Sequence, residues 1–251
     1  MTSIAIVTGA SSGLGAELVR LLCAGEFGPI DEVWAVARHA EKTDPLVRPF
    51  ALDLTDPASF DVLEAALAET PGARVALLVN NAGFGTFGDF AGMPAADNAA
   101  MVRLLMLAPV ELTYRVLPHM AAGSRILNVA SVAAFMPQPG LATYSATKRF
   151  VLDLSRALDA ELGPVGIHVT ALCPKFMRTG FLDHAGADDV ANRMARLTGF
   201  EDVRRVAARG LAAARAGRAL CIPSADMRAL YVATRLLPYP LALAVERAPM
   251  R

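Results

Sequence analysis

The sequence predicts a single doubly wound α/β domain built on a parallel sheet. Short apolar runs rich in β-branched residues alternate along the chain with longer stretches of helical periodicity, as in sheets whose strands are joined through helices. The first apolar run passes through a glycine-rich turn directly into a helical pattern. No internal repeat, low-complexity tract or linker divides the chain, so we expect one domain over residues 1–251.

Composition excludes several classes of protein. Hydrophobic residues make up 54% of the chain and charged residues 19%, which supplies a large core and argues against disorder. Lysine plus arginine and aspartate plus glutamate number 24 each, so we expect no general attraction to nucleic acid or to an anionic membrane. Three widely spaced cysteines indicate neither a disulfide framework nor a metal site. They fit a reducing cytoplasm, and the lack of a leader or a bilayer-long apolar run agrees with that location.

Seven short segments are predicted to be the strands of a seven-stranded sheet flanked by helices. The strands are expected at 3–7, 32–36, 47–54, 75–79, 124–130, 166–172 and 219–222. The longer amphipathic segments between them predict helices from about residue 16 and at 58–69, 97–120, 144–162 and 201–216.

The glycine turn between the first strand and the first helix is the first candidate site. The strand leads into Thr8-Gly-Ala-Ser-Ser-Gly-Leu-Gly15. Glycines let a backbone approach a pyrophosphate closely, and the free amides at the start of the helix then face the anion. A plain tight turn is the alternative, because a glycine pattern alone is weak evidence. We expect a dinucleotide to contact Gly9, Ser11, Ser12, Gly13, Leu14 and Gly15.

The end of the second strand indicates which dinucleotide is bound. An acid there would hold a free ribose hydroxyl, whereas a basic residue would accept a 2′-phosphate. The chain has Ala37-Arg38-His39 at this point, with no acid. The guanidinium of Arg38 therefore favours NADP(H) over NAD(H). An arginine that is merely solvated is the alternative.

The third and fourth strands end in further candidate contacts. Asp53, followed by Leu54, is placed either to meet an adenine amino group or to cap the next helix, and both roles can coexist. The fourth strand runs into Asn80-Asn-Ala-Gly83, whose small residues allow a ligand to lie close to the backbone. We expect Leu54, Asn81, Ala82 and Gly83 to contact the cofactor together with Asp53.

The segment Tyr144-Ser-Ala-Thr-Lys148 carries the candidate chemistry, with Ser131 upstream at the end of the fifth strand. Residues four apart lie on one face of a helix, so the phenol and the ammonium are expected side by side. A neighbouring positive charge lowers the pKa of a tyrosine from its usual value near ~10, which suits proton exchange with an alcohol or a carbonyl. Ser131 could hold the same oxygen. A chance pair on a helix surface is the alternative for the tyrosine and lysine alone.

Three motifs in order resemble the short-chain dehydrogenase/reductase family: the glycine turn, Asn80 to Gly83, and Ser131 with Tyr144 and Lys148. The resemblance covers essentially the whole chain and is strongest to bacterial NADP-dependent oxidoreductases. It implies a Rossmann-type fold, a nicotinamide cofactor and hydride transfer between an alcohol and a carbonyl. It also implies that Tyr144 and Lys148 contact the nicotinamide ribose.

Further properties follow from the same resemblance. Pro174 and Thr179 match a loop that contacts the cofactor in the family, with the threonine at the nicotinamide carboxamide. Family members often assemble through such helices as 144–162, which implies a homodimer or homotetramer. No metal is expected.

Two positions depart from the family pattern. Leu105, in the helix predicted at 97–120, stands where the family usually has an asparagine that helps hold a water chain from the catalytic lysine to solvent. Leucine cannot hydrogen-bond through its side chain, so we expect slowed turnover. Lys175 replaces a glycine and lacks glycine's freedom at positive φ, so the loop backbone is expected to differ. Its ammonium could reach the cofactor pyrophosphate or an anionic substrate group, or remain solvated.

The last third of the chain holds less specific signals. Residues 176–200 resemble a substrate lid, whose methionines and phenylalanines suit an apolar substrate but could equally be core: Met177, Phe181, Met194 and Leu197. His168 in the sixth strand is expected to be a packed or edge residue, and Asn128 in the fifth a local hydrogen-bonding group. The tail, 224–251, is expected to cover the pocket, with a membrane-surface or partner-binding helix as the alternative.

These observations predict an NADP(H)-dependent oxidoreductase that interconverts a carbonyl and a secondary or primary alcohol by hydride transfer, on an apolar substrate. In reduction Ser131 would hold the carbonyl oxygen, Tyr144 would donate the proton, and Lys148 would keep the pKa of the phenol low. The alternative is a nucleotide-binding protein of the same fold with weakened catalysis, acting as a cofactor sensor or scaffold. Only Leu105 and Lys175 support that alternative.

Overall fold

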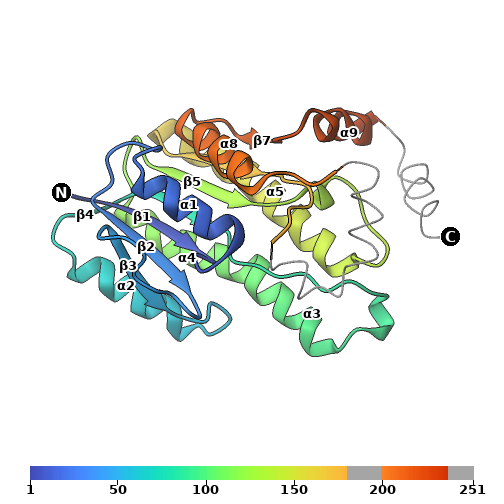
Figure 1. Ribbon diagram of the computed structural model, residues 1–251, viewed down its shortest axis with the longest axis horizontal. Coiled ribbons are helices and arrows are strands. Elements are labelled where there is room, and N and C mark those ends of the chain that lie inside the picture. The colour runs from blue at the N-terminus through green and yellow to red at the C-terminus, as the bar shows by residue number, and fades with distance from the viewer. Residues whose placement is uncertain (180–198, 237–251) are drawn as a thin grey trace.

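One parallel sheet forms the centre of the protein. The computed structural model describes residues 1–179 and 199–236, and helices lie on both faces of the sheet (Figure 1). The strand order is β3-β2-β1-β4-β5-β6-β7, which confirms the predicted doubly wound α/β architecture with seven strands. The strands are β1 (Thr2–Thr8), β2 (Glu32–Ala37), β3 (Val47–Ala51), β4 (Ala73–Asn80), β5 (Arg125–Val129), β6 (His168–Leu172) and β7 (Leu220–Cys221).

The helices connect these strands and cover both faces of the sheet. The α-helices are α1 (Gly13–Cys23), α2 (Ala58–Glu69), α3 (Ala95–Val102), α4 (Ala108–Val116), α5 (Ala142–Leu162), α8 (Val203–Arg215) and α9 (Ala225–Leu236). A π-helical turn, Arg103–Leu107, joins α3 to α4. Short 3₁₀ turns lie at Phe90–Gly92, Leu117–His119, Val132–Ala134 and Gly163–Val165.

The central strands are buried on both sides, as β1 illustrates. Ala5 and Val7 face the core beneath α1 and α8, whereas Ile4 and Ile6 face the core beneath α2 and α4. All four side chains are fully buried. A continuous apolar run is what a parallel strand covered on both faces requires, and this explains why the sequence does not alternate there.

The third strand is shorter than predicted, because the chain turns earlier. β3 ends at Ala51, whereas the apolar pattern continues to residue 54. The carboxylate of Asp53 accepts hydrogen bonds from the backbone N–H of Thr55 at 2.9 Å and from its hydroxyl at 2.8 Å. Such local side-chain bonds compete with the strand ladder and begin a turn.

The helix predicted at 97–120 is interrupted by the π-helical turn. The N–H of Ala108 donates to the carbonyl of Arg103, five residues back. Pro109 has no N–H to give the carbonyl of Leu105, and its ring crowds that carbonyl, so a regular α-helical ladder cannot pass this point. The proline therefore accounts for the wider turn that carries Leu105.

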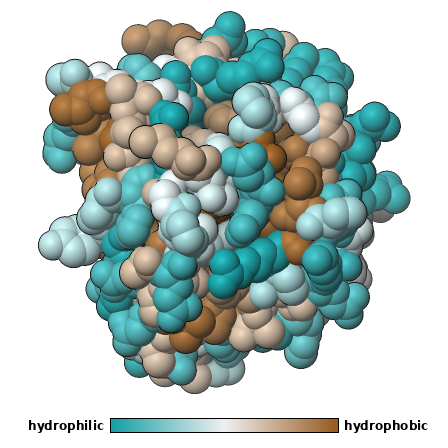
Figure 2. Space-filling view, turned by 90° about the vertical axis from the view of Figure 1, so that its left-hand side faces the viewer, coloured by the Kyte–Doolittle hydropathy of each residue, from teal (hydrophilic) through white to brown (hydrophobic). Residues whose placement is uncertain are grey.

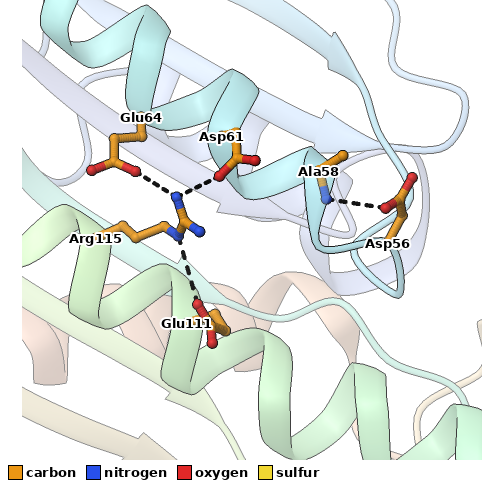
Figure 3. Close-up of polar contacts among 6 residues, drawn as sticks. All are labelled: Asp56, Ala58, Asp61, Glu64, Glu111 and Arg115. Carbon is orange, nitrogen blue, oxygen red and sulfur yellow. Dashed lines mark hydrogen bonds and ion pairs between the residues drawn. The ribbon is translucent and has the colours of Figure 1, made fainter.

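A cluster of ion pairs fixes α2 against α4 (Figure 3). The guanidinium of Arg115 on α4 contacts Asp61 and Glu64 on α2 and, at 3.6 Å, Glu111 on its own helix. The three carboxylates are largely exposed, so water and salt screen these pairs and each adds little to stability. The cluster therefore joins two helices at the protein surface.

The surface at the amino ends of the strands is mixed in character. Figure 2 shows separate hydrophobic side chains among hydrophilic ones over this face, which is normal for a solvated surface. Within residues 1–179 and 199–236, no helix is long and apolar enough to span a membrane. In the same part of the chain, no three acidic, histidine or cysteine side chains gather as metal ligands would.

Candidate active site

The candidate site lies where the strand order reverses. β1 pairs with β2 on one side and with β4 on the other, and the strands run left to right in Figure 1, toward α3. In open α/β sheets, ligands bind in the crevice outside the carboxyl ends of the strands at such a point. The loops after β1 and β4 therefore form the base of the site.

Hydrogen bonds fasten these two loops to each other. The side-chain amide of Asn81 donates to the carbonyls of Thr8 at 2.8 Å and Gly9 at 3.3 Å. The hydroxyl of Thr8 accepts from the backbone N–H groups of Asn81 and Ala82, both at 2.9 Å. Asn81 thus holds the glycine turn in a fixed position, a role for which the sequence carried no separate signal.

The glycine turn, residues 9–15, requires glycine at three of its positions. Gly9 has φ of 66° and Gly13 has φ of 54°, in the left-handed region that favours glycine. A Cβ at Gly15 would lie 2.0 Å from the carbonyl oxygen of Gly9, so helix α1 and the turn touch through their backbones. A Cβ at Gly83 would lie 2.6 Å from a methyl group of Leu105, so that side chain would have to move to admit it.

The start of α1 presents free backbone amides beside this turn. Ser12 is the N-cap, and its side chain makes no capping hydrogen bond. No acidic residue lies in the first helical turn. Ser11 and Ser12 are exposed, whereas the side chain of Leu14 is buried in the core, so Leu14 can offer a ligand only its backbone. These features fit a phosphate group, which uncapped amides at a helix start bind well.

Arg38 and Asp53 lie close together at the ends of β2 and β3. Both are exposed. Hydrogen bonds from Thr55 hold the pKa of the Asp53 carboxyl below its ordinary value, and the nearby charge of Arg38 adds to this effect. Asp53 thus forms a local turn with Thr55, and the expectation that it caps the next helix is wrong, because the N-cap of α2 is Pro57. Leu54 is buried and lines a small cavity behind the site.

Ser131 and Tyr144 are brought together from separate elements. Ser131 follows β5 and caps the 3₁₀ turn Val132–Ala134, where its hydroxyl accepts from the N–H of Ala133 at 3.1 Å. Tyr144 lies in the first turn of α5, and a hydrogen bond joins its side chain to that of Ser131. Burial raises the pKa of Tyr144 to about 12, and the bond with Ser131 only partly opposes this.

Lys148 lies one helical turn beyond Tyr144 and points into the protein. Its Nζ donates to the carbonyl of Val129 at 2.8 Å and is 5.7 Å from the centroid of the Tyr144 ring. Burial lowers the pKa of Lys148 to about 8. The expectation that the ammonium holds the pKa of Tyr144 low is therefore wrong for this structure, because loss of hydration dominates both groups.

A buried polar network supports the strands beneath these residues. The side-chain amide of Asn80 donates to Asn128 at 2.8 Å and to Thr113 at 3.2 Å, and the amide of Asn128 donates to Ser155 at 3.0 Å. This confirms Asn128 as a local hydrogen-bonding group. In the sequence, these four polar residues stand at otherwise apolar positions of two strands and two helices. That pattern indicates buried hydrogen bonds but does not predict which residues pair.

A cavity of about 20 Å³ lies behind Lys148. Leu105, Pro109 and Asn80 are among the residues that line it. Leu105 is buried and fills the space between Gly83 and the lysine. The volume suffices for about one water molecule, but the wall that Leu105 contributes is apolar.

Replacing Leu105 with asparagine tests whether that apolar wall slows turnover. We expect Leu105→Asn to raise kcat by about 2- to 10-fold, because a polar side chain would let water connect Lys148 with solvent. The measurement is steady-state kinetics on a responding carbonyl. Leu105→Met, which keeps the site apolar, is the control and should leave kcat unchanged. An equal or lower rate in the asparagine variant would show that leucine is no handicap.

The loop at residues 174–179 contacts both the segment after Ser131 and the glycine turn. The carbonyl of Pro174 accepts from the N–H of Val132 at 3.0 Å, and the side chain of Thr179 would lie 3.2 Å from a Cβ at Gly13. Among the described residues, every positive φ belongs to a glycine, so the loop accommodates Lys175 without left-handed backbone. The ammonium of Lys175 forms an ion pair with Asp226 on α9 at 2.9 Å.

The remaining sequence predictions lie around this centre or beyond the described residues. His168 is a strand-edge residue whose Nδ1 lies 3.2 Å from Asp159, as expected. Of the proposed lid, 176–200, only 176–179 and 199–200 are described, so the prediction for Phe181, Met194 and Leu197 lies outside the described residues. The tail begins with helix α9, and its remainder, 237–251, also lies outside them.

The family model for short chain dehydrogenases matches residues 3–189 of the chain. A sulfoacetaldehyde reductase from Chromohalobacter salexigens is 31% identical over 208 residues, which cover 76% of this chain and 79% of the relative. A short-chain dehydrogenase from Sphingobium yanoikuyae in complex with NADPH superposes with a TM-score of 0.77 at 29% identity, covering 94% of this chain and 92% of that one. A 3-ketoacyl-(acyl-carrier-protein) reductase from Brucella melitensis complexed with NADH gives a TM-score of 0.73 at 27% identity, covering 84% and 90%.

Proposed function

Because the chain belongs to the short-chain dehydrogenase/reductase family of oxidoreductases, we propose that it interconverts a carbonyl and an alcohol with NADP(H). The observation that carries this proposal is the hydrogen-bonded pair Ser131–Tyr144, with Lys148 one helical turn away, at the same sheet edge as the glycine turn. The alternative, a sensor or scaffold with weakened catalysis, requires that this constellation bind cofactor without turning over any substrate.

The residues at the sheet edge fit a dinucleotide. The glycine turn leaves space that a Cβ would fill, and the uncapped start of α1 suits a pyrophosphate. We propose that Asn81, Ala82 and Gly83 lie along the cofactor and that Pro174 and Thr179 lie at its nicotinamide end. A bound nicotinamide would supply or accept the hydride.

The chain's own groups handle the oxygen and its proton. We propose that Ser131 donates a hydrogen bond to the substrate carbonyl oxygen and that Tyr144 delivers a proton to the same oxygen. With a pKa of about 12, the buried phenol is protonated at neutral pH, which is the state a proton donor needs in reduction. Lys148 would hold the nicotinamide ribose and refill the proton on Tyr144. We therefore propose carbonyl reduction as the favoured direction.

An apolar substrate is proposed from the aromatic residues beside the site. The rings of Phe87, after β4, and Phe176, after β6, lie 6.3 Å apart. The backbone N–H of Gly88 donates to the carbonyl of Gly140, which joins the loop after β4 to the segment before α5. Aromatic side chains at the mouth of a pocket favour apolar ligands, with a few polar groups setting orientation.

We also propose a cytoplasmic homodimer or homotetramer. The thiols of Cys23, Cys173 and Cys221 are free, which fits a reducing compartment. Exposed apolar side chains at Leu107, Val110 and Tyr114 follow one side of the helix at α4 and support association with another subunit.

Turnover assays test the proposed function directly. Purified protein is mixed with NADPH or NADH and a panel of aldehydes and ketones, and the cofactor absorbance is followed. We expect NADPH to be oxidised with at least one aromatic or long-chain ketone. Cofactor binding without oxidation of either cofactor across the panel would support the sensor or scaffold alternative instead.

The cofactor preference has its own test at Arg38. We expect Arg38→Ala to raise the KM for NADPH by about 10- to 100-fold, because a charge-assisted phosphate contact is lost, while the KM for NADH changes little. Arg48→Ala is the matched control, since Arg48 is also a partly exposed arginine but stacks on Trp34 in the neighbouring strand, 5.0 Å from the ring centre. Equal effects on both cofactors would remove the 2′-phosphate role.

A further inference from the structure

Two acidic residues, Glu201 and Asp226, hold the loop at residues 174–179 through contacts with Lys175. The backbone N–H of Lys175 donates to the carboxylate of Glu201 at 3.0 Å, and its ammonium donates to Asp226 at 2.9 Å. The N–H of Glu201 in turn donates to the carbonyl of Phe176 at 2.8 Å. Residues 26 and 51 positions later in the chain thus grip the middle of the loop.

The ion pair of Lys175 and Asp226 is shielded from water on one side. The side chain of Lys175 is only 9% exposed, whereas that of Asp226 is 43% exposed. Burial would raise the pKa of Asp226, but the hydrogen bond from Lys175 leaves it below its ordinary value. A charge held at low exposure interacts more strongly with its partner than a solvated one does, so this pair restrains the loop more than a surface pair would.

Helix α9, which carries Asp226, is itself fixed against the other side of the site. The ring of Tyr231 lies 4.8 Å from that of Phe135, which follows the 3₁₀ turn beginning after Ser131. Met227 packs into the same cluster. Figure 1 shows α9 beyond β7, at the upper right of the view. One helix therefore contacts both segments that end at the candidate active site.

Two of the three charged residues lie outside the segment that the family model matches. Glu201 and Asp226 lie beyond residues 3–189, whereas Lys175 lies within them. A glycine at this position would leave the loop without the ion pair to α9. The lysine is therefore paired with acids supplied by the last third of this chain.

We propose that Lys175, Glu201 and Asp226 are positioning residues that hold the 174–179 loop ready for the nicotinamide end of the cofactor. The inner side of the loop supports this role, since Pro174 is bonded to Val132 beside Ser131 and Thr179 lies against Gly13. A loop already in its binding conformation loses less conformational entropy when a ligand arrives, and so binds it more tightly. The inference rests on the proposed function, because it presumes a nicotinamide cofactor at the glycine turn.

A double-mutant cycle on the ion pair tests the inference. The dissociation constants of NADPH and NADH are measured for wild type, Lys175→Met, Asp226→Asn and the double variant, together with kcat and KM. We expect each single variant to raise the dissociation constant and the cofactor KM by about 3- to 10-fold, with kcat within about twofold, since contacting residues couple. The double variant should bind no more weakly than the weaker single variant.

Arg115→Met is the matched control. It breaks the ion pairs between α2 and α4, so it should lower thermal stability without changing cofactor affinity. All titrations are made well below each variant's own unfolding temperature. Unchanged affinity in Lys175→Met, or effects of the two single variants that simply multiply, would overturn the inference. If the wild-type protein binds neither cofactor, the proposed function is wrong and this inference falls with it. If the wild type binds a cofactor tightly and the variants bind it with the same dissociation constant, only this inference is wrong.

Discussion

Replacing Tyr144 with phenylalanine is expected to lower kcat/KM by about 10²- to 10⁴-fold, the range typical for loss of a positioned proton donor. The change removes one oxygen from a partly buried side chain whose hydrogen bond goes to Ser131. The other tyrosines within residues 1–179 and 199–236 are Tyr114, exposed on α4, and Tyr231, packed against Phe135, and the ring at position 144 itself still packs. The chemical step should therefore fail while the cofactor site keeps its shape.

The experiment compares steady-state kinetics with cofactor affinity in the same preparations. The dissociation constant of NADPH should stay within about twofold of wild type, because phenylalanine preserves the packing of α5. Tyr114→Phe is the matched control, since Tyr114 is the same residue type on α4 and is 77% exposed. Full activity in Tyr144→Phe would remove the proton donor from the proposed mechanism, whatever the cofactor does.

Replacing Lys148 with methionine is expected to have opposite effects on activity and on stability. Activity should fall by about 10²-fold or more, because the group that refills the proton on Tyr144 is lost. The free energy of unfolding at neutral pH should rise by roughly 1–2 kcal/mol, because a charge buried at 5% exposure is replaced by an apolar chain of similar length. The lost hydrogen bond to Val129 keeps this gain small.

The gain in stability should depend on pH in a defined direction. In wild type the pKa of Lys148 is about 8 when folded and 10.5 at its ordinary value, so the unfolded chain binds more protons between these values. Wild-type stability therefore rises with pH across this window. The advantage of Lys148→Met should be complete below about pH 8 and vanish above about pH 10.5, as urea denaturation at several pH values would reveal. A variant less stable than wild type at neutral pH would contradict the cost assigned to this buried ammonium.

The elements of the fold were predictable because their signals are local. The apolar run of β1 lies within seven consecutive residues, and α2 begins and ends where its periodicity does, at Ala58 and Glu69. The glycine turn was equally predictable, because a position with no room for a side chain, such as Gly15, appears in the sequence as a glycine. The end of β3 was placed too late because a single carboxylate, that of Asp53, turns the chain before the apolar pattern stops.

The parts of the site that the sequence did not reveal depend on distant partners. The bond from Asn80 to Asn128 joins residues 48 positions apart, and the pair of Lys175 with Asp226 spans 51. Helix and strand periodicity relate only residues a few positions apart, so they cannot predict such pairs. The pKa of Tyr144 was expected to fall because its neighbour is a lysine, but burial depends on the whole surroundings and raises it. The sequence spacing predicted which side chains lie close together, but it could not predict how burial changes their pKa values.

The hydrogen bonds from Asn81 to the glycine turn have a consequence for soaking crystals with a nucleotide. Since one amide already engages the carbonyls of Thr8 and Gly9, the glycine turn is fastened to the loop after β4 without a nucleotide. We therefore expect crystals grown without cofactor to tolerate soaking with a nucleotide, because these two hydrogen bonds need not break to admit its pyrophosphate.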